Sequence, residues 1–216
     1  MPGQLLSDDV ADSAEVKPTF GHYAAWLIGK KIITSIDVHR NHYETTTRAI
    51  EEKYRTSNFW RSILSGLKDV DAQYLIDHKY PLIAQFTPEI LIKSWRSFFE
   101  KTYRKNILSN ANFPNPPEGG WLTPQNWYAD IHDIIRTTII VKYLDGVPLL
   151  VEFLRQESAK HAVEFDGNLE ARVDGYYGAQ CHCRSTFEIT ALDWTMVQTK
   201  ISLEIQITTL ACTRFG

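Results

Sequence analysis

Residues 200 to 208 read KISLEIQIT, and this stretch decides most of what can be inferred about the fold. Its even-numbered positions carry polar side chains, while its odd-numbered positions are apolar: Ile201, Leu203, Ile205 and Ile207. A side-chain period of two is typical of a strand with one buried and one polar face. The stretch therefore predicts a half-buried β-strand with Glu204 and Gln206 on its polar face.

An earlier run, residues 179 to 189, alternates in the same way. Its drier positions are Ala179, Cys181, Cys183, Ser185, Phe187 and Ile189, and polar residues stand between them. We expect the two runs to pair as antiparallel strands, which would gather five polar side chains into one patch: Gln180, His182, Arg184, Glu204 and Gln206. The alternative is an ordinary solvated face, which many antiparallel sheets have.

Upstream, the apolar residues recur at spacings of three and four, which is the helical period. The predicted helices span residues 36–54, 58–75 and 88–103, and the last is expected to begin at Thr87-Pro88-Glu89, because proline suits the first helical position. Residues 137–143 predict a strand and residues 147–155 a short helix. A helical half followed by a strand-rich half predicts an α+β fold.

These elements suggest how the chain is organised. Residues 1–17 are polar and acidic and are expected to form a flexible tail. Residues 18–108 form the helical region, residues 109–120 a linker rich in proline and glycine, and residues 121–216 the sheet-bearing core.

Composition excludes several classes of protein. The chain has 216 residues, of which 44% are hydrophobic and 23% charged, and its net charge is −3. These values are ordinary for a folded protein and allow one domain, or a catalytic domain with a helical attachment. No apolar run approaches the ~18 residues of a membrane span, and no signal segment is evident, so we expect a cytoplasmic protein without membrane partners.

Three cysteines, Cys181, Cys183 and Cys212, fit a reducing compartment. The triplet Cys181-His182-Cys183 could suggest zinc, but a structural zinc needs four ligands and no second cluster is present. Strand alternation favours two cysteines packed in the core.

Two carboxylates and a loop suggest phosphate chemistry. Asp133 precedes a β-branched run, Glu204 lies on a polar strand face, and residues 172–178 form a glycine-rich loop with two tyrosines. Mg²⁺ prefers oxygen ligands and commonly takes one or two carboxylates together with phosphates. We therefore expect a magnesium-nucleotide site with Asp133 and Glu204 as catalytic residues and metal ligands.

The order of these motifs resembles the RelA/SpoT alarmone synthetases. That family has an aspartate at the head of a strand, a Lys-x-Asn-Gly-Tyr loop and a final strand reading Glu-Ile-Gln-Ile-Arg-Thr; the counterparts here are Asp133, residues 172–176 and residues 204–209. The resemblance covers about residues 130 to 209. It implies a mixed, mainly antiparallel sheet of the nucleotidyltransferase-like type, and a pyrophosphokinase that moves the β,γ-diphosphate of ATP to a ribose 3′-hydroxyl.

The resemblance also assigns roles to residues. It implies that Asp133 binds Mg²⁺, that Glu204 supports the metal or accepts the hydroxyl proton, and that Tyr176, after Gly175, stacks on the acceptor base. Arg172 takes the place of a phosphate-binding lysine, and Arg136 could reach the triphosphate. The remaining candidates for nucleotide binding come from the polar strand faces: Gln180, His182, Arg184 and Gln206.

This chain departs from the family pattern at several positions. Thr138 and Thr208 stand where arginines are usual, and Gln180 replaces a histidine. An upstream Arg-x-Lys segment for adenine is not evident, which leaves Lys101, Arg104 and Lys105 as basic candidates, and Asp130 is a rival to Asp133. The helix that usually follows the closing motif is also not evident before Gly216.

Several acceptors and partners fit the resemblance. The opening Asp-Ile-Ile-Arg-x-Thr is closer to the toxic small alarmone synthetases, which suggests a neutralising antitoxin as a partner. GDP, GTP or an adenine nucleotide could be the acceptor, and so could the 3′-terminal adenosine of tRNA. A possible RNA-binding stripe, or alternatively a solvated helix face, consists of Lys30, Lys31, Arg40, Arg48, Lys53 and Arg55. A degenerate domain that binds nucleotide or a partner without catalysis is the other class.

Overall fold

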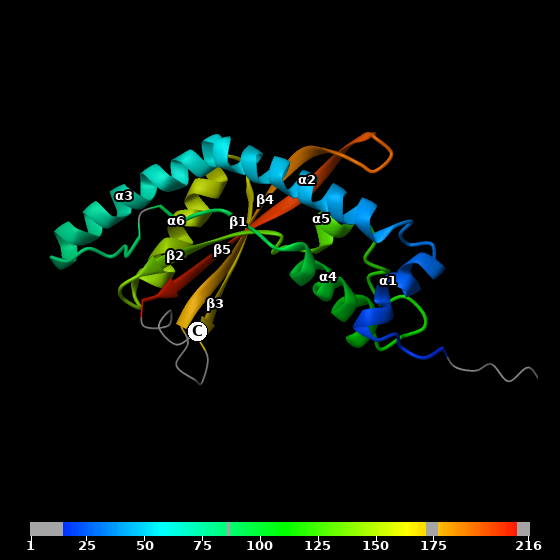
Figure 1. Ribbon diagram of the computed structural model, residues 1–216. Helices are drawn as coiled ribbons and strands as arrows, with labels where there is room; N and C mark the ends of the chain where they lie inside the picture. The colour runs from blue at the N-terminus through cyan, green and yellow to red at the C-terminus, as the bar shows by residue number, and fades with distance from the viewer. Residues whose placement is uncertain (1–14, 86, 172–176, 211–216) are drawn as a thin grey trace, which may run out of the picture.

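The computed structural model describes residues 15–85, 87–171 and 177–210 (Figure 1). Within these residues, five strands form one mixed sheet in the order β1-β2-β5-β4-β3. The strands are β1 (Leu91–Ile92), β2 (Ile135–Val141), β3 (Glu164–Ala171), β4 (Tyr177–Thr190) and β5 (Met196–Thr209). Only β2 and β5 run parallel, and the other neighbours are antiparallel. The predicted α+β class and the mainly antiparallel sheet are therefore confirmed.

The long hairpin of β4 and β5 forms the centre of the sheet. Its register places Gln180 opposite Gln206 and His182 opposite Glu204, as expected from the two alternating runs. The odd-numbered positions near the middle of both strands are buried, including Cys181 and Leu203, neither of which has exposed surface. The prediction of antiparallel pairing with one dry face is thus confirmed.

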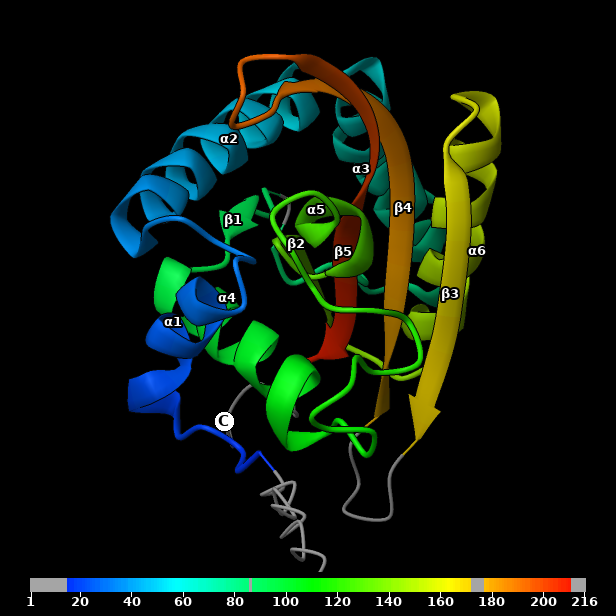
Figure 2. The same ribbon diagram turned by 90° about the vertical axis from the view of Figure 1, so that its right-hand side faces the viewer.

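Helices cover the dry face of the sheet and one end of it. The helices are α1 (Phe20–Gly29), α2 (Ile36–Thr56), α3 (Asn58–His78), α4 (Trp95–Tyr103), α5 (Trp127–Asp130) and α6 (Gly146–Lys160), and a π-helical turn, η1 (Arg104–Leu108), extends α4. Figures 1 and 2 show α3 and α6 side by side along the sheet, with α1 and α4 grouped at the other end of α2.

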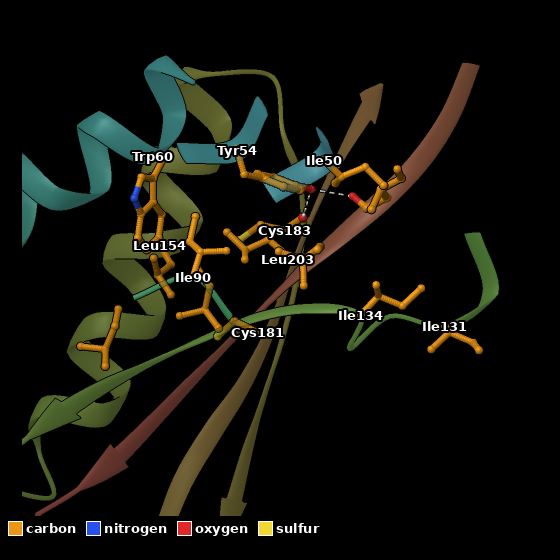
Figure 3. Close-up of a cluster of buried hydrophobic side chains, with 14 of the residues drawn as sticks. Ile50, Tyr54, Trp60, Ile90, Ile131, Ile134, Leu154, Cys181, Cys183 and Leu203 are labelled. Carbon is orange, nitrogen blue, oxygen red and sulfur yellow. Dashed lines mark hydrogen bonds between the residues drawn. The ribbon is translucent and has the colours of Figure 1, made fainter. Parts of the chain in front are cut away.

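The core lies between the dry face and the helices α2, α3 and α6. Ile50 and Tyr54 from α2, Trp60 from α3 and Leu154 from α6 meet Leu203 of β5 there (Figure 3). The Tyr54 hydroxyl donates to the carbonyl of Ile201 at 2.7 Å, which ties α2 to the hairpin. Burial raises the pKa of this hydroxyl, so it remains a donor.

The two strand cysteines also belong to this core. Cys181 and Cys183 are buried, and burial raises the pKa of each thiol to about 12. His182 lies between them on the opposite face, because successive side chains of a strand alternate. The three residues therefore do not converge on a metal, in agreement with the preference for core packing.

One predicted helix begins seven residues later than expected. The 88–103 helix was expected to start at Pro88, but α4 starts at Trp95, where the Ser94 hydroxyl accepts a hydrogen bond from the Ser97 amide at 3.3 Å. Leu91 and Ile92 instead pair with β2, and the Lys93 amide donates to the Ile134 carbonyl at 2.8 Å. Hydrogen bonding to the edge of β2 therefore outweighs the local helical signal.

The expected linker contains no helix or strand in residues 109–120, and its two flanks are held together. The buried Asn106 side chain donates to the Leu122 carbonyl and accepts from the Leu122 amide. That this segment divides two units stays a prediction. Among the described helices, none is both long and apolar enough to cross a membrane.

Candidate active site

A small polar cavity opens on the face of the sheet opposite the core. Its volume is about 260 Å³. The α4–η1 helix, the end of α5 with the turn before β2, and strands β2, β4 and β5 supply its walls. The described residues that line it are Lys101, Lys105, Asp130, His132, Asp133, Arg136, Gln180, His182, Glu204 and Gln206.

The sheet register explains why residues distant in sequence meet here. Arg136 of β2 is the parallel partner of Glu204 on β5, and His182 of β4 is the antiparallel partner of the same residue. Paired residues of neighbouring strands share a face, so these three side chains form one row. Gln206 and Gln180 form the next row. Together with Asp133, which stands just before β2, six predicted site residues are thus brought together.

Asp133 lies between two lysines. Lys93 Nζ donates to its Oδ2 at 2.9 Å, and Lys101 Nζ lies 2.7 Å from its Oδ1. Each carboxylate oxygen of Asp133 therefore faces one lysine. Burial by itself would raise the pKa of this carboxyl, but the two lysines outweigh burial and the pKa is lowered. Asp133 is therefore an ionised carboxylate at neutral pH.

Glu204 is the more buried carboxylate, with 4% of its surface exposed. Its Oε1 accepts a hydrogen bond from Gln206 Nε2 at 2.6 Å, two residues along the same strand face. Beside it, the His182 ring lies within 3.3 Å of the Ser202 hydroxyl through Nδ1. A carboxylate held by a neutral amide in a nearly dry wall is well placed to accept a proton from a bound hydroxyl.

His132 was not among the predicted residues, yet it lines the cavity. Its ring lies 5.6 Å from that of His182, in an edge-to-face arrangement. Burial lowers the pKa of His132, and the nearby cations Arg184, Lys105 and Lys101 lower it further. His132 thus supplies a neutral ring at physiological pH. Its position next to Asp133 in sequence was the only available signal.

Lys93 was also missed, because it was expected inside a helix. Lys101 and Lys105 had been considered as basic candidates, and both line the cavity, whereas Arg104 is exposed outside it. The rival carboxylate Asp130 lines the cavity as well. The sequence therefore indicated that basic residues of α4 and η1 reach the cavity. The contact of Lys93 with Asp133 could not be predicted, because it depends on the pairing of β1 with β2.

Other predicted residues lie elsewhere or outside the described part of the chain. Arg184 shares the polar face but pairs with Glu164 at 3.1 Å and Asp166 at 3.6 Å on β3. Arg172, Gly175 and Tyr176 lie outside the described residues.

The suggested RNA stripe is partly neutralised. Arg40 pairs with Glu44, Arg55 with Glu51, and Lys30 with Glu15, while Lys53 donates to the Glu188 carbonyl. The other two cations of the suggested stripe are Lys31 and Arg48. Most of these cations are therefore already engaged, which favours the alternative interpretation of this surface as a solvated helix face.

The oxygen-bearing side chains of this cavity suit Mg²⁺ only together with the phosphates of a bound nucleotide. No group of three or more histidine, cysteine, aspartate or glutamate side chains in the described residues could hold a metal on its own. Two carboxylates, Asp133 and Glu204, line the same cavity, and Mg²⁺ is commonly bound by one or two carboxylates plus phosphate oxygens. The residues thus fit an ion that arrives with a nucleotide.

Comparisons with known proteins add little. No family model matches the chain, and no curated protein matches it. The crystal structure of smu.1046c from Streptococcus mutans UA159 is similar at 19% identity and a TM-score of 0.37, covering 73% of each chain. A similarity of this size carries no argument about fold family or function.

Proposed function

We propose that the protein is a magnesium-dependent pyrophosphokinase of the RelA/SpoT type, which moves the β,γ-diphosphate of ATP to the ribose 3′-hydroxyl of a purine nucleotide. The observation that carries the proposal is the convergence of Asp133, Arg136 and Glu204 in one polar cavity with Lys101 and Lys105. The two carboxylates are the residues that the family resemblance assigns to catalysis. The proposed fold family is the corresponding nucleotidyltransferase-like sheet.

The chemistry requires a base, positive charge and alignment. The 3′-oxygen of the acceptor attacks the β-phosphorus of ATP, the bond from that phosphorus to the α,β-bridging oxygen breaks, and AMP leaves with this oxygen. Glu204 accepts the hydroxyl proton. Bound Mg²⁺, held by Asp133 and Glu204, would spread the negative charge of the phosphates.

The cations around the cavity would bind and position the phosphates. Lys101 and Lys105 approach from the helical side and Arg136 from the sheet, so phosphates placed between them would be held from two directions. Lys101 is engaged by Asp133 at 2.7 Å, and a bound phosphate would compete for this lysine. Positioning and charge stabilisation supply most of the rate in phosphoryl transfer.

GDP, GTP or an adenine nucleotide is the proposed acceptor. The resemblance assigns base stacking to Tyr176 and phosphate binding to Arg172, and both lie outside the described residues. The 3′-terminal adenosine of tRNA is a less favoured acceptor, since three of the six cations of the suggested stripe are already paired with glutamates. A growth-arresting role with a neutralising partner in the cytoplasm belongs to the same proposal.

The direct test follows two labels. Purified protein is incubated with Mg²⁺, an acceptor from the set GDP, GTP, AMP, ADP and deacylated tRNA, and ATP labelled at either the α- or the γ-phosphate. Diphosphate transfer moves the γ-label to the acceptor and converts the α-label to AMP. Transfer of a single phosphate would yield α-labelled ADP instead. If no acceptor takes the label from intact ATP, the pyrophosphokinase proposal fails and a non-catalytic nucleotide-binding domain becomes the better interpretation.

A further inference from the structure

A groove lies between α3 and α6, the two helices that lie side by side on the core face of the sheet (Figures 1 and 2). Its volume is about 460 Å³. The helices pack closely at Gly66 of α3, because a Cβ there would lie 2.6 Å from the Phe153 ring of α6. The groove lining on α3 begins one turn later, at Val70, and extends to His78. The catalytic cavity opens on the other face of the sheet, so the groove is a separate site.

The floor of this groove is apolar and remains partly exposed. Val70 and Phe153 are half-buried, and Leu149 of α6 keeps 40% of its surface exposed. The lining residues recur at spacings of three and four on both helices, so one stripe of each helix faces the groove. An exposed apolar groove of this kind is a common receptor for the apolar face of another helix.

An aromatic cluster extends this surface beyond the end of α3. The Tyr74 ring stacks on the His78 ring, with 4.1 Å between centroids, and its centroid lies 5.9 Å from that of Tyr80. The Tyr80 ring in turn lies 4.6 Å from the Tyr143 ring, and these two tyrosines are 42% and 38% exposed. Tyrosine is enriched at protein contacts, because it buries a large surface with few rotatable bonds.

The rim of the groove carries two carboxylates. Asp77 of α3 and Glu152 of α6 each accept hydrogen bonds from the amide of a glutamine four residues away on the same helix, at 3.0 to 3.1 Å. A neutral amide leaves the charge of a carboxylate in place, and the described lining contains no lysine or arginine. Arg155, outside the lining, approaches Glu152 to 3.4 Å, but its guanidinium lies over the Phe165 ring of β3. The rim therefore has negative charge.

This charge restricts what can cover the groove. In a symmetric contact between two copies of the chain, the same acidic rim would be present on both sides, and like charges placed together cost free energy. A surface of anionic lipids would be repelled for the same reason. The complementary occupant has apolar side chains for the floor and cations for the rim.

We propose that the groove binds an amphipathic helix of a partner protein, with a leucine-rich face flanked by lysine or arginine. The apolar side chains, at spacings of three and four, contact Val70, Leu149 and Phe153, and the flanking cations pair with Asp77 and Glu152. The inference goes beyond the proposed function and does not depend on it.

The experiment titrates the full chain with a synthetic helix of this chemistry. The probe is a capped, fluorescently labelled peptide of two Leu-Lys-Lys-Leu-Leu-Lys-Lys heptads, and the matched peptide has glutamate at every lysine position. Fluorescence anisotropy at low and high salt measures the Kd. The test variants are Leu149→Ser and the double variant Asp77→Asn with Glu152→Gln. The control double variant, Asp37→Asn with Glu52→Gln, changes two exposed carboxylates of α2, and circular dichroism checks that each variant is folded.

We expect the lysine peptide to bind saturably, and the glutamate peptide to bind at least about tenfold more weakly. Loss of both rim charges should raise the Kd of the lysine peptide roughly 2- to 30-fold, and added salt should reduce this difference. Leu149→Ser should raise the Kd roughly 3- to 30-fold, because the peptide buries less apolar surface. The control variant should bind like the unaltered protein.

Three results of the titration would overturn the proposal: no saturable binding of the lysine peptide at millimolar concentration, equal binding of the two peptides, or a rim variant that binds as tightly as the control. Sedimentation of the unaltered protein tests the other occupant. A dimer that forms as the concentration rises and is lost in Leu149→Ser would identify a second copy as the occupant, and the proposal would be wrong.

Discussion

The two faces of strand β5 lie in opposite surroundings. Leu203 has no exposed surface and packs among Ile50, Tyr54 and Leu154, whereas its neighbour Glu204 faces a polar cavity. Both residues are almost completely buried, so exposure does not distinguish them. The difference is the surroundings, which are apolar side chains on one face and charged or amide groups on the other.

This contrast shows how one strand can contribute to both stability and chemistry. Burial of apolar surface on the core face stabilises the fold by about 25 cal/mol per Å². Burial of Glu204 and Asp133 costs stability unless partners compensate. Gln206 and the two lysines provide that compensation. Sites at which a sequence tolerates such a cost are often functional.

The largest expected effect is on the polar face. Glu204→Gln should reduce diphosphate transfer about a hundredfold or more, because the amide keeps the shape but cannot accept the proton. Glu188→Gln, an exposed change farther along the polar face of β4, is the matched control and should leave the rate unchanged. A Glu204→Gln protein that keeps more than about a tenth of the rate has lost only about 1.4 kcal/mol, and Glu204 would not be the base.

The equivalent change on the core face should affect stability instead. Leu203→Ala removes a fully buried side chain and should lower the free energy of unfolding by about 2–5 kcal/mol. Denaturant titration measures this loss, and the folded fraction should retain its transfer rate. If folded Leu203→Ala and folded Glu204→Gln lose the transfer rate equally, the core face does not serve stability alone and the contrast between the two faces is wrong.

A hydrogen bond that crosses the core should have an intermediate effect. Tyr54→Phe removes the donor to the Ile201 carbonyl and should cost about 1–3 kcal/mol, since a buried acceptor loses its partner. Urea unfolding followed by circular dichroism is the measurement. Tyr103→Phe, which removes a partly buried hydroxyl bonded to the Pro18 carbonyl outside this core, is the comparison and should cost less.

Acid should weaken the polar face before the core. The pKa of Asp133 is lowered in the folded protein, so the folded state binds a proton there less readily than the unfolded chain. The ionised group therefore contributes stability above the ordinary carboxyl pKa, and this stability is lost as the pH falls through the folded pKa. Unfolding measured from pH 7 to pH 3 should show a steeper loss in the unaltered protein than in Asp133→Asn. The control is Asp69→Asn, an exposed change that should show the same pH dependence of unfolding as the unaltered protein. If Asp133→Asn and the unaltered protein lose stability in parallel as the pH falls, Asp133 does not contribute this stability.

The smallest effect is expected on the outer surface of α2. Arg40 and Glu44 form an exposed pair, four residues apart and 2.9 Å from each other. Glu44→Gln should change the free energy of unfolding by only about 0.3–0.5 kcal/mol. Thermal unfolding at low and high salt measures this, and a change above about 1 kcal/mol would show that the pair does more than an ordinary surface contact.

Local patterns predicted much of this molecule. The alternation in residues 179–189 and 200–208 predicted both strands, their pairing and the face that each side chain takes, because a strand has a strict period of two. The helical spacing of residues 36–54 and 58–75 predicted α2 and α3 within a few residues. The same alternation predicted that Gln180, His182, Glu204 and Gln206 would share one face.

Other features needed contacts between distant segments. Strand β1 has two residues, and it exists because Leu91 and Ile92 hydrogen-bond to the edge of β2. That pairing moved the start of the expected helix from Pro88 to Trp95 and brought Lys93 to Asp133. Similarly, the parallel pairing of β2 with β5 placed Arg136 beside Glu204, and the packing of α3 beside α6 formed the groove between them.

The sequence by itself determined which side chains share a face, because strand and helix periods act between neighbours a few residues apart. It also supplied the two carboxylates, one just before a strand and the other on a polar strand face. The tertiary structure decided which faces meet, which lysines reach Asp133 and where the cavities lie. Those outcomes depend on hydrogen bonds, ion pairs and packing between residues about 30 to 150 positions apart, and no local period encodes them.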